Sequence, residues 1–178
     1  MIDPPPRRVM VIGTSGSGKT TFAGRLAERF GLTHVELDAL FWLPDWQQPE
    51  ESDFRARVDA ALDIPGGWVV DGNYSRVQPE VLGRADTAVW LDLPMRTCLW
   101  RVTSRAIRRA RDRELMWGTN RERWSQIVGP RSLAWWVIST HGRHRRQNAE
   151  RLADPAYAHL RVRRFLSTAA AEAWLDSA

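Results

Sequence analysis

Lysine and cysteine are almost absent from this chain of 178 residues. One lysine, Lys19, stands among 26 lysines and arginines, and the one cysteine is Cys98. A single cysteine excludes an internal disulfide framework and any metal site built from several cysteines. A single lysine, in a chain that uses arginine elsewhere, directs attention to the stretch around residue 19.

Long apolar runs are also missing. The longest later run, LAWWVI at residues 133–138, is too short to span a bilayer, and the proline-rich start MIDPPPRR lacks the regions of a signal peptide. We see no internal repeat and no low-complexity linker. The sequence therefore predicts one cytoplasmic domain over residues 1–178 without a membrane partner. Its net charge of +5 suits a nucleotide as well as a nucleic acid, so charge does not choose between them.

Lys19 lies in the stretch GTSGSGKT, which matches the phosphate-loop pattern G-x-x-x-x-G-K-[ST] between an apolar run and a helix-compatible segment. Glycines let the backbone curl until several N–H groups point at one phosphate chain, and the following helix adds its positive N-terminal end. Lys19 would reach the β- and γ-phosphates, and Thr20 would offer its hydroxyl to Mg²⁺. The motif thus predicts ATP and Mg²⁺ as cofactors. The candidate binding residues are Gly13, Ser15, Gly16, Ser17, Gly18, Lys19, Thr20 and Thr21.

Short apolar runs alternate with helical patterns along the chain, which is typical of a parallel sheet covered by helices on both faces. The fold class is therefore α/β, with a doubly wound, five-stranded parallel sheet. The predicted strands are residues 8–12, 33–37, 68–70, 87–91 and 160–165. The predicted helices are residues 19–30, 51–62, 95–110, 120–127, 130–152 and 168–175.

Acidic residues follow three of the predicted strands, where ligands of such sheets gather. Asp71 ends WVVD and Asp92 ends AVWLD, and the two compete for the role of holding Mg²⁺. Each could instead cap the turn after its strand. Glu36 and Asp38 stand at i and i+2 on the second strand, a spacing that puts both side chains on one face. A carboxylate suits a hydroxyl acceptor, because it orients the O–H and takes its proton late, whereas it would repel a phosphate.

A resemblance to a known family is carried by the phosphate loop, by VELD, by WVVDGNY and by WLDLP with the arginine-rich helix that follows it. Together these stretches resemble the adenylate-kinase-like nucleoside and small-molecule kinases, which are P-loop NTPases. More closely, HVELDALFWLPDW and WVVDGNYS are similar to bacterial proteins labelled topology modulation protein. The resemblance covers almost the whole chain and implies the strand order 2-3-1-4-5. That order puts Asp71 beside the phosphate loop, so it is preferred over Asp92 for holding Mg²⁺, through water.

The resemblance also implies roles for arginines. Arg101 corresponds to a residue near adenine, and Arg105 to one that reaches the transferred phosphates. Arg121 and Arg123 would lie in a short arginine-rich lid, at about residues 110–127, that closes over the phosphates. The acceptor region would span about residues 38–64. A solvated basic face is favoured for the remaining arginines of the helix, which are Arg108, Arg109, Arg111 and Arg113.

Two departures from adenylate kinases bear on the acceptor. Phe41 stands where they carry the arginine that would clamp a monophosphate, and Arg76 comes one place late after the third strand. AMP is therefore expected to be a poor acceptor. Glu36 and Asp38 instead resemble the acidic pair with which shikimate-type kinases address a metal and a hydroxyl-bearing substrate. Two tryptophans that follow, Trp42 and Trp46, would wall the acceptor pocket or pack in the core.

The first functional hypothesis is an ATP- and Mg²⁺-dependent phosphotransferase acting on a small hydroxyl-bearing or nucleoside-like acceptor. The second is a nucleotide-regulated nucleic-acid-binding protein, motivated by the basic segment His141 to Arg151 and by the topology-modulation label. That segment lacks interleaved aromatics, which favours a solvated helix. A regulatory GTPase is excluded, because its guanine-reading N-K-x-D needs a second lysine. The predicted catalytic residues are Lys19, Asp38, Asp71 and Arg105, and the predicted metal-side residues are Thr20, Asp71 and Glu36.

Overall fold

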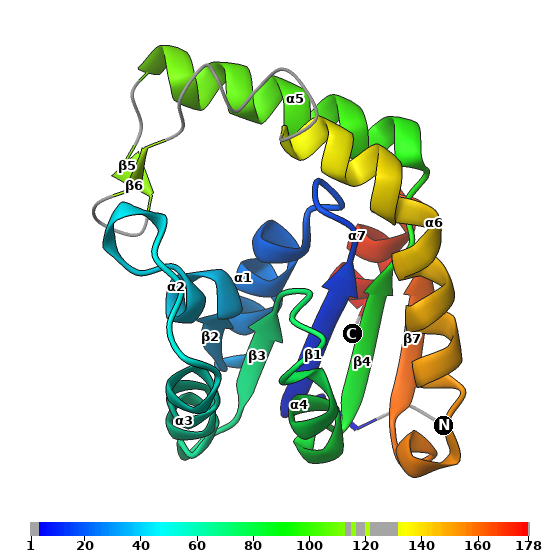
Figure 1. Cartoon of the computed structure of the whole chain (residues 1–178). Helices are drawn as coiled ribbons and strands as arrows, with labels where there is room; N and C mark the ends of the chain where they lie inside the picture. The colour runs from blue at the N-terminus through cyan, green and yellow to red at the C-terminus, as the bar shows by residue number, and fades with distance from the viewer. Residues whose placement is uncertain (1–3, 113–114, 117–119, 122–131, 178) are drawn as a thin grey trace.

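The computed structural model describes residues 4–112, 115–116, 120–121 and 132–177. A five-stranded parallel sheet forms its centre, with the strand order β2-β3-β1-β4-β7 (Figure 1). When these five strands are numbered 1 to 5 along the chain, their order in the sheet is the predicted 2-3-1-4-5. All five predicted strands are confirmed. Their bounds are Arg8–Gly13 (β1), Thr33–Glu36 (β2), Trp68–Asp71 (β3), Thr87–Leu91 (β4) and Arg161–Phe165 (β7).

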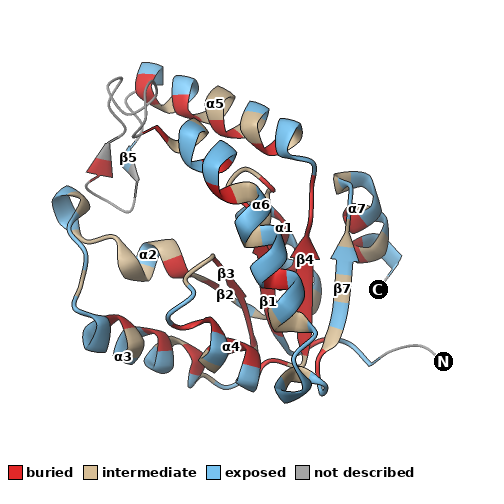
Figure 2. Ribbon diagram, turned by 45° about the vertical axis from the view of Figure 1, so that its right-hand side comes forward, coloured by how far each residue is buried: buried red, intermediate tan, exposed pale blue. Residues whose placement is uncertain are grey.

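Helices cover both faces of the sheet, with their buried residues turned towards it (Figure 2). On one face lie α1 (Lys19–Phe30) and α7 (Thr168–Ser177). On the other face lie α3 (Glu51–Leu62), α4 (Gln78–Arg84) and α6 (Leu133–Leu152), followed by the short η3 (Pro155–Tyr157). The long α5 (Met95–Asp112) packs on α6 above the carboxyl edge of the sheet. None of these helices has the length and apolar content that crossing a membrane requires.

The central strand β1 shows why this sheet forms. Val9 and Val11 are buried in the cluster with α1 and α7, while Met10 and Ile12 are buried in the cluster on the opposite face. A continuous apolar run of this kind is what a strand covered on both faces requires. β1 therefore carries the phosphate loop from the middle of the core to the carboxyl edge.

The chain leaves β2 earlier than predicted. β2 ends at Glu36, and α2 (Leu37–Phe41) begins at the next residue. Leu37 is fully buried against Gly72, where an added Cβ would lie 2.8 Å from the Leu37 Cβ. The expectation that Glu36 and Asp38 share one face of a strand is therefore wrong, because Asp38 lies in the first turn of a helix.

The helix predicted over residues 120–127 is wrong at its start. Asn120 and Arg121 form β6, which pairs antiparallel with β5 (Leu115–Met116), and residues 122–127 lie outside the described residues. The helix predicted from residue 130 is α6, which begins at Leu133 because the Ser132 side chain accepts a hydrogen bond from the Trp135 N–H and caps it. The short α4, whose first turn contains a proline, was not predicted.

Candidate active site

The phosphate loop joins β1 to α1, and its backbone takes conformations that require glycine at two positions. Gly16 and Gly18 have φ values of 82° and 91°, in the left-handed region that favours glycine. A Cβ at Gly16 would also collide with the Cys98 carbonyl oxygen in the first turn of α5. Gly18 is the N-cap of α1, so the loop delivers its backbone N–H groups and the positive end of α1 to one place.

Asp71 lies at the end of β3, directly beside β1 in the sheet register. Its Oδ1 accepts a hydrogen bond from the Thr20 hydroxyl at 2.9 Å, and its Oδ2 lies 2.8 Å from Nε2 of His34. The hydrogen bond with Asp71 raises the pKa of His34, and it outweighs the opposite effect of burial. His34 was not identified from the sequence, because only the pairing of β2 with β3 brings it to Asp71.

Asp92, the other candidate for the metal side, has different neighbours. Its Oδ2 accepts hydrogen bonds at 3.0 Å from Nε of Arg145 on α6 and at 3.0 Å from Nε of Arg164 on β7. The Arg164 guanidinium also stacks over the Trp90 ring, 4.3 Å from its centroid. Asp92 therefore links α6 and β7 to the end of β4. The two arginines already balance the negative charge of its carboxylate.

Lys19 interacts electrostatically with the three other predicted catalytic side chains. Burial lowers the pKa of its ammonium, Asp71 and Asp38 act in the opposite direction, and Arg105 lowers it further. The fold thus brings Lys19, Asp38, Asp71 and Arg105 around one centre, although they come from four separate segments. Burial disfavours the charged form of Lys19, and a polyanionic ligand bound beside it would favour that form.

A cavity of about 280 Å³ adjoins the phosphate loop. Its lining includes the apolar side chains of Phe22 and Leu91 and the basic side chains of Arg101 and Arg105. The Arg101 guanidinium donates a hydrogen bond to the Thr168 hydroxyl at 2.9 Å, which fixes it beside the loop. A flat, largely apolar ring joined to phosphates fits this combination of walls.

The acceptor side, as predicted from the sequence, is built around Asp38. The Tyr74 hydroxyl donates a hydrogen bond to its Oδ1 at 2.6 Å. Phe41 packs with its ring centroid 4.6 Å from that of Tyr74 and 5.0 Å from that of Trp42. Trp42 in turn meets Trp46 edge to face at 5.4 Å. Phe41 is therefore part of an aromatic cluster that supports Asp38.

Arg76, the arginine that comes one place late in the sequence, does not approach this cluster. Its side chain is 61% exposed, and its Nε lies 3.7 Å from a carboxylate oxygen of Glu51 on the surface. Its charge is directed to Glu51 at the surface.

A side chain of the predicted lid region contacts residues 43–46, which are called the acceptor loop because they lie in the predicted acceptor region. Asn120 on β6 is buried, and its Oδ1 accepts a hydrogen bond from the Trp46 backbone N–H at 2.8 Å. Its Nδ2 donates to the Leu43 carbonyl oxygen at 3.1 Å. These bonds hold η1 (Pro44–Trp46), in which Asp45 has a φ of 57° and Trp46 a φ of 60°. The Arg121 side chain and all of Arg123, both predicted to act in the lid, lie outside the described residues.

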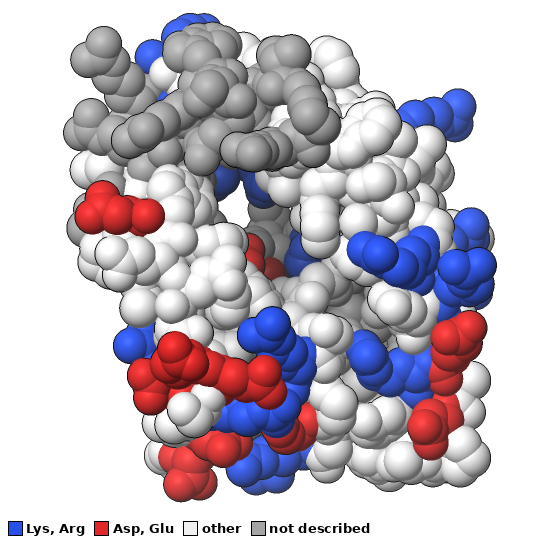
Figure 3. Space-filling model, viewed as in Figure 1, with Lys and Arg blue, Asp and Glu red and all other residues white. Residues whose placement is uncertain are grey.

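The space-filling view shows a hollow at the carboxyl edge of the sheet, with basic and acidic side chains at its walls (Figure 3). Within the described part of the chain, no group of three or more His, Cys, Asp or Glu side chains is arranged to hold a metal ion. A cation at this site would therefore need ligands from a bound molecule or from water in addition to the protein.

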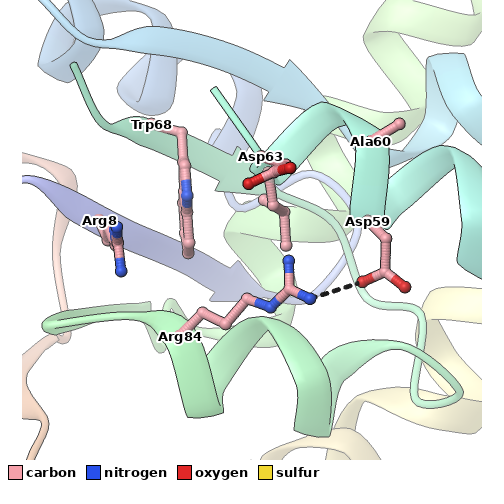
Figure 4. A pocket seen from close by; sticks show the side chains of 7 residues that line it. Arg8, Asp59, Ala60, Asp63, Trp68 and Arg84 are labelled. Carbon is pink, nitrogen blue, oxygen red and sulfur yellow. Dashed lines mark ion pairs between the residues drawn. The ribbon is translucent and has the colours of Figure 1, made fainter. Parts of the chain in front are cut away.

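A second cavity, of about 490 Å³, lies at the opposite edge of the sheet (Figure 4). Arg8 and Trp68, at the starts of β1 and β3, line it together with the ion pair of Arg84 and Asp59, whose atoms are 3.1 Å apart. The phosphate loop leaves the other end of β1, so this cavity contributes nothing to the site around Lys19.

The chain is similar to known kinases. No family model matches the chain. Over 145 residues the chain is 30% identical to a cytidylate kinase of Pyrococcus horikoshii, a match that covers 68% of this chain and 71% of that protein. A crystal structure of shikimate kinase from Bacteroides thetaiotaomicron has the same fold, with a TM-score of 0.54, 15% identity and coverage of 97% and 96% of the two chains. A gluconokinase from Sinorhizobium meliloti 1021 gives a TM-score of 0.52 at 19% identity, with coverage of 98% and 94%.

The phosphate loop, the five-stranded parallel sheet and the match to the cytidylate kinase lead to one conclusion. The chain is a nucleotide-using phosphotransferase, and it belongs to the P-loop kinases of the adenylate-kinase-like type.

Proposed function

We propose that this kinase transfers the γ-phosphoryl group of ATP, with Mg²⁺, to a hydroxyl group of a small hydroxyl-bearing or nucleoside-like acceptor. The observation that supports this proposal is the position of Asp38. It lies close enough to Lys19 to interact with it electrostatically, and the Tyr74 hydroxyl holds one of its oxygens. A fixed carboxylate beside the phosphate-binding lysine is suited to orienting an O–H group for phosphoryl transfer.

The phosphate loop and the cavity beside it fit ATP. Gly16 and Gly18 have positive φ values, which favour glycine, and a Cβ at Gly16 would collide with the Cys98 carbonyl oxygen of α5. In the proposal the base occupies the cavity near Arg101, and Arg105 points towards the transferred phosphate. Bound phosphates would favour the charged form of Lys19, which burial disfavours.

The neighbours of Asp71 fit Mg²⁺. Thr20 and Asp71 are hydrogen-bonded to each other beside the loop, and Glu36 stands opposite Asp71 in the register of β2 and β3. Hydroxyl and carboxylate oxygens, with water and phosphate oxygens, are the ligands that Mg²⁺ prefers. When bound, Mg²⁺ would neutralise charge on the transferred phosphate. We propose that Thr20 offers its hydroxyl and that Asp71 and Glu36 act through water.

A monophosphate acceptor is the second candidate, because the relative from Pyrococcus horikoshii is named cytidylate kinase. The geometry around Asp38 favours the hydroxyl acceptor over this one. Phe41 is packed among aromatic rings and Arg76 pairs with Glu51 at the surface, so neither supplies a phosphate clamp. A lost clamp removes charge-assisted hydrogen bonds, each worth about 1.5–3 kcal/mol.

Nucleic-acid binding by the basic segment His141 to Arg151 has less support. The segment is the second half of α6, where Arg145 pairs with Asp92 and Asn148 is buried. Part of its charge and part of its surface are therefore used in packing. A filter-binding assay with duplex and single-stranded DNA, with and without ATP, tests this alternative.

The test of the proposed function is a screen for ADP formation from ATP and Mg²⁺. The panel contains hydroxyl-bearing metabolites, nucleosides, CMP and AMP, each measured against an ATP-only background. We expect a hydroxyl-bearing compound to react and AMP to be poor. Asp38→Asn should abolish transfer with little effect on ATP affinity, while the matched control Asp154→Asn, at the N-cap of η3, should leave transfer unchanged. Rapid phosphorylation of CMP or AMP would show that this chain is an ordinary monophosphate kinase.

A further inference from the structure

The four residues 71–74, of sequence DGNY, link the phosphate loop to the acceptor side of the site. Asn73 donates a hydrogen bond from its Nδ2 to the carbonyl oxygen of Gly13 at 2.8 Å. Tyr74, the next residue, donates its hydroxyl hydrogen bond to Asp38 at 2.6 Å. Neighbouring side chains therefore tie the start of the phosphate loop and the acceptor carboxylate to the same short turn.

This turn has little freedom to move. Gly72 has a φ of 143°, and a Cβ there would lie 2.8 Å from the Cβ of Leu37. Asp71 at its start is nearly buried, with hydrogen bonds to Thr20 and His34. A fixed backbone on both sides gives Tyr74 a defined place from which to reach Asp38.

The Tyr74 side chain is itself held by other groups. Its hydroxyl has a second hydrogen bond, with the Trp42 side chain, and its ring lies 4.6 Å from that of Phe41 and 5.2 Å from that of Phe54. Burial raises the pKa of the Tyr74 hydroxyl far above its ordinary value, and the Asp38 charge adds to this effect. The hydroxyl therefore stays protonated and remains a donor at neutral pH, where the kinase is assayed.

We propose that Tyr74 is a positioning residue, which fixes Oδ1 of Asp38 so that Oδ2 is presented to the acceptor hydroxyl. This inference rests on the proposed function, in which Asp38 orients the acceptor. The Tyr74 hydroxyl donates the hydrogen bond that holds Oδ1 of the Asp38 side chain. Without it the carboxylate would be free to rotate about two side-chain torsions.

Orientation is the property that this reaction needs from a carboxylate. In a loose phosphoryl-transfer transition state the acceptor proton leaves late, so the strength of the base matters less than its direction. A hydrogen bond from tyrosine makes Asp38 a weaker base and at the same time fixes its direction. A displacement of about 1 Å in such a group can reduce the rate by about 100-fold.

The kinetic test is Tyr74→Phe, which removes the hydroxyl and keeps the ring packed among Phe41 and Phe54. Tyr157→Phe is the matched control, because the chain has 2 tyrosines and Tyr157 lies on η3. Activity is measured with ATP, Mg²⁺ and the best acceptor of the screen, and by the slow hydrolysis of ATP, in which water takes the place of the acceptor. We expect kcat to fall about 10- to 100-fold in Tyr74→Phe, with KM for ATP within about twofold of wild type. Tyr157→Phe should have wild-type kcat.

A double-mutant cycle separates positioning from a merely structural role. If Tyr74 acts through Asp38, Tyr74→Phe should change kcat by less than about twofold in a protein that already carries Asp38→Asn. An equal fold-loss of kcat in both backgrounds, or no loss in either, would overturn the proposal.

The contact itself is tested without any acceptor. In the Tyr157→Phe protein Tyr74 is the sole tyrosine, so its ionisation can be followed by the absorbance of the phenolate. We expect Asp38→Asn to lower the pH at which this phenol ionises, because a neighbouring negative charge is removed. Ionisation at the same pH in both proteins would overturn the proposal. A shift in a protein that neither transfers phosphate nor hydrolyses ATP would contradict the proposed function, and with it the positioning role.

Discussion

Thr20 donates a hydrogen bond to Asp71 at 2.9 Å, although 51 positions separate them along the chain. The bond joins the first turn of α1 to the end of β3, and it leaves the Asp71 carboxylate beside the phosphate loop. Asp92 ends the strand on the other side of β1, yet its carboxylate pairs with two arginines. Asp71 and Asp92 both follow an apolar strand in the sequence, but in the fold Asp92 forms ion pairs with two arginines, while Asp71 is hydrogen-bonded beside the phosphate loop.

The first prediction is that Asp71→Asn and Asp92→Asn separate activity from stability. Asp71→Asn should reduce Mg²⁺-dependent turnover more than Asp92→Asn, because Asp71 is the aspartate proposed to act on Mg²⁺. Asp92→Asn should weaken its ion pairs by about 1–2 kcal/mol, since both arginines are half exposed. The expected drop in Tm is about 2–8 °C. Turnover at several Mg²⁺ concentrations and thermal unfolding measure the two effects.

The reverse order of the two activity losses would show that the choice of Asp71 for the metal side is wrong. Arg164→Gln serves as a control, because it removes one partner of Asp92 and leaves the carboxylate in place. It should lower Tm while Mg²⁺ dependence stays that of wild type.

The second prediction concerns the single lysine. Lys19→Ala should reduce ATP turnover on the order of 100-fold, because a charged donor to the phosphates is lost. Lys19→Arg should also fail, since the planar guanidinium does not fit a cradle that suits a compact ammonium. The pKa of Lys19 is lowered mainly by burial, so its charge costs stability at neutral pH, and neither the fold nor Tm should suffer in Lys19→Ala. Unchanged ATP affinity and turnover in Lys19→Ala would contradict the phosphate-loop assignment.

Local sequence patterns were sufficient to predict the sheet and the phosphate loop. The bounds of α1 and α3 agree with those predicted, because an amphipathic pattern and clear ends define each helix. The end of β2 was missed, since nothing in THVELDALF shows that Leu37 must turn into the core against Gly72. The helix predicted at residue 120 was wrong for a related reason, because the tertiary bonds of Asn120 decide its conformation.

The residues that complete the site could not be found in this way. Tyr74 is 36 positions from Asp38, and His34 is 37 positions from Asp71, so their contacts exist only after the strands pair. The resemblance to known kinases supplied the strand order that favoured Asp71, and the arginines around Asp92 supply the physical reason. The catalytic and metal-side roles of all the predicted residues remain predictions, namely those of Lys19, Thr20, Glu36, Asp38, Asp71 and Arg105.

The third prediction is that Asn120 controls the conformation of the acceptor loop. Asn120→Ala removes the acceptor of the Trp46 N–H and the donor to the Leu43 carbonyl oxygen. Asp45 and Trp46 have positive φ values, which cost about 1 kcal/mol or more each and persist only while the surroundings hold them. The loop should therefore relax, with faster exchange of the Trp46 amide hydrogen and a higher KM for the acceptor.

Hydrogen exchange of the Trp46 amide measures this effect. Asn148→Ala is the matched control, because Asn148 is also buried but lies on α6. Equal protection of the Trp46 amide in wild type and Asn120→Ala would show that the two hydrogen bonds do not hold the loop.

The last prediction is a loss of stability in alkali that depends on Tyr74. An unfolded tyrosine has a pKa of about 10, and burial raises the pKa of Tyr74 in the folded protein well above its ordinary value. The unfolded state therefore releases the phenol proton first. The contribution of Tyr74 to stability is complete below about pH 10 and is lost as the pH rises towards the folded pKa, by at most about 1.4 kcal/mol per pH unit.

Other groups also titrate in this range, and the lowered pKa of Lys19 acts in the opposite direction. The measurement is therefore a difference, the free energy of unfolding of wild type minus that of Tyr74→Phe, from urea titrations between pH 8 and 11. The difference should be constant at the lower pH values and then fall as the unfolded phenol ionises. The same comparison with Tyr157→Phe is the control, because it removes a tyrosine hydroxyl elsewhere in the fold, on η3. A difference for Tyr74→Phe that stays constant up to pH 11 would mean that the Tyr74 hydroxyl is not buried against Asp38, and the support for Asp38 would have to come from elsewhere.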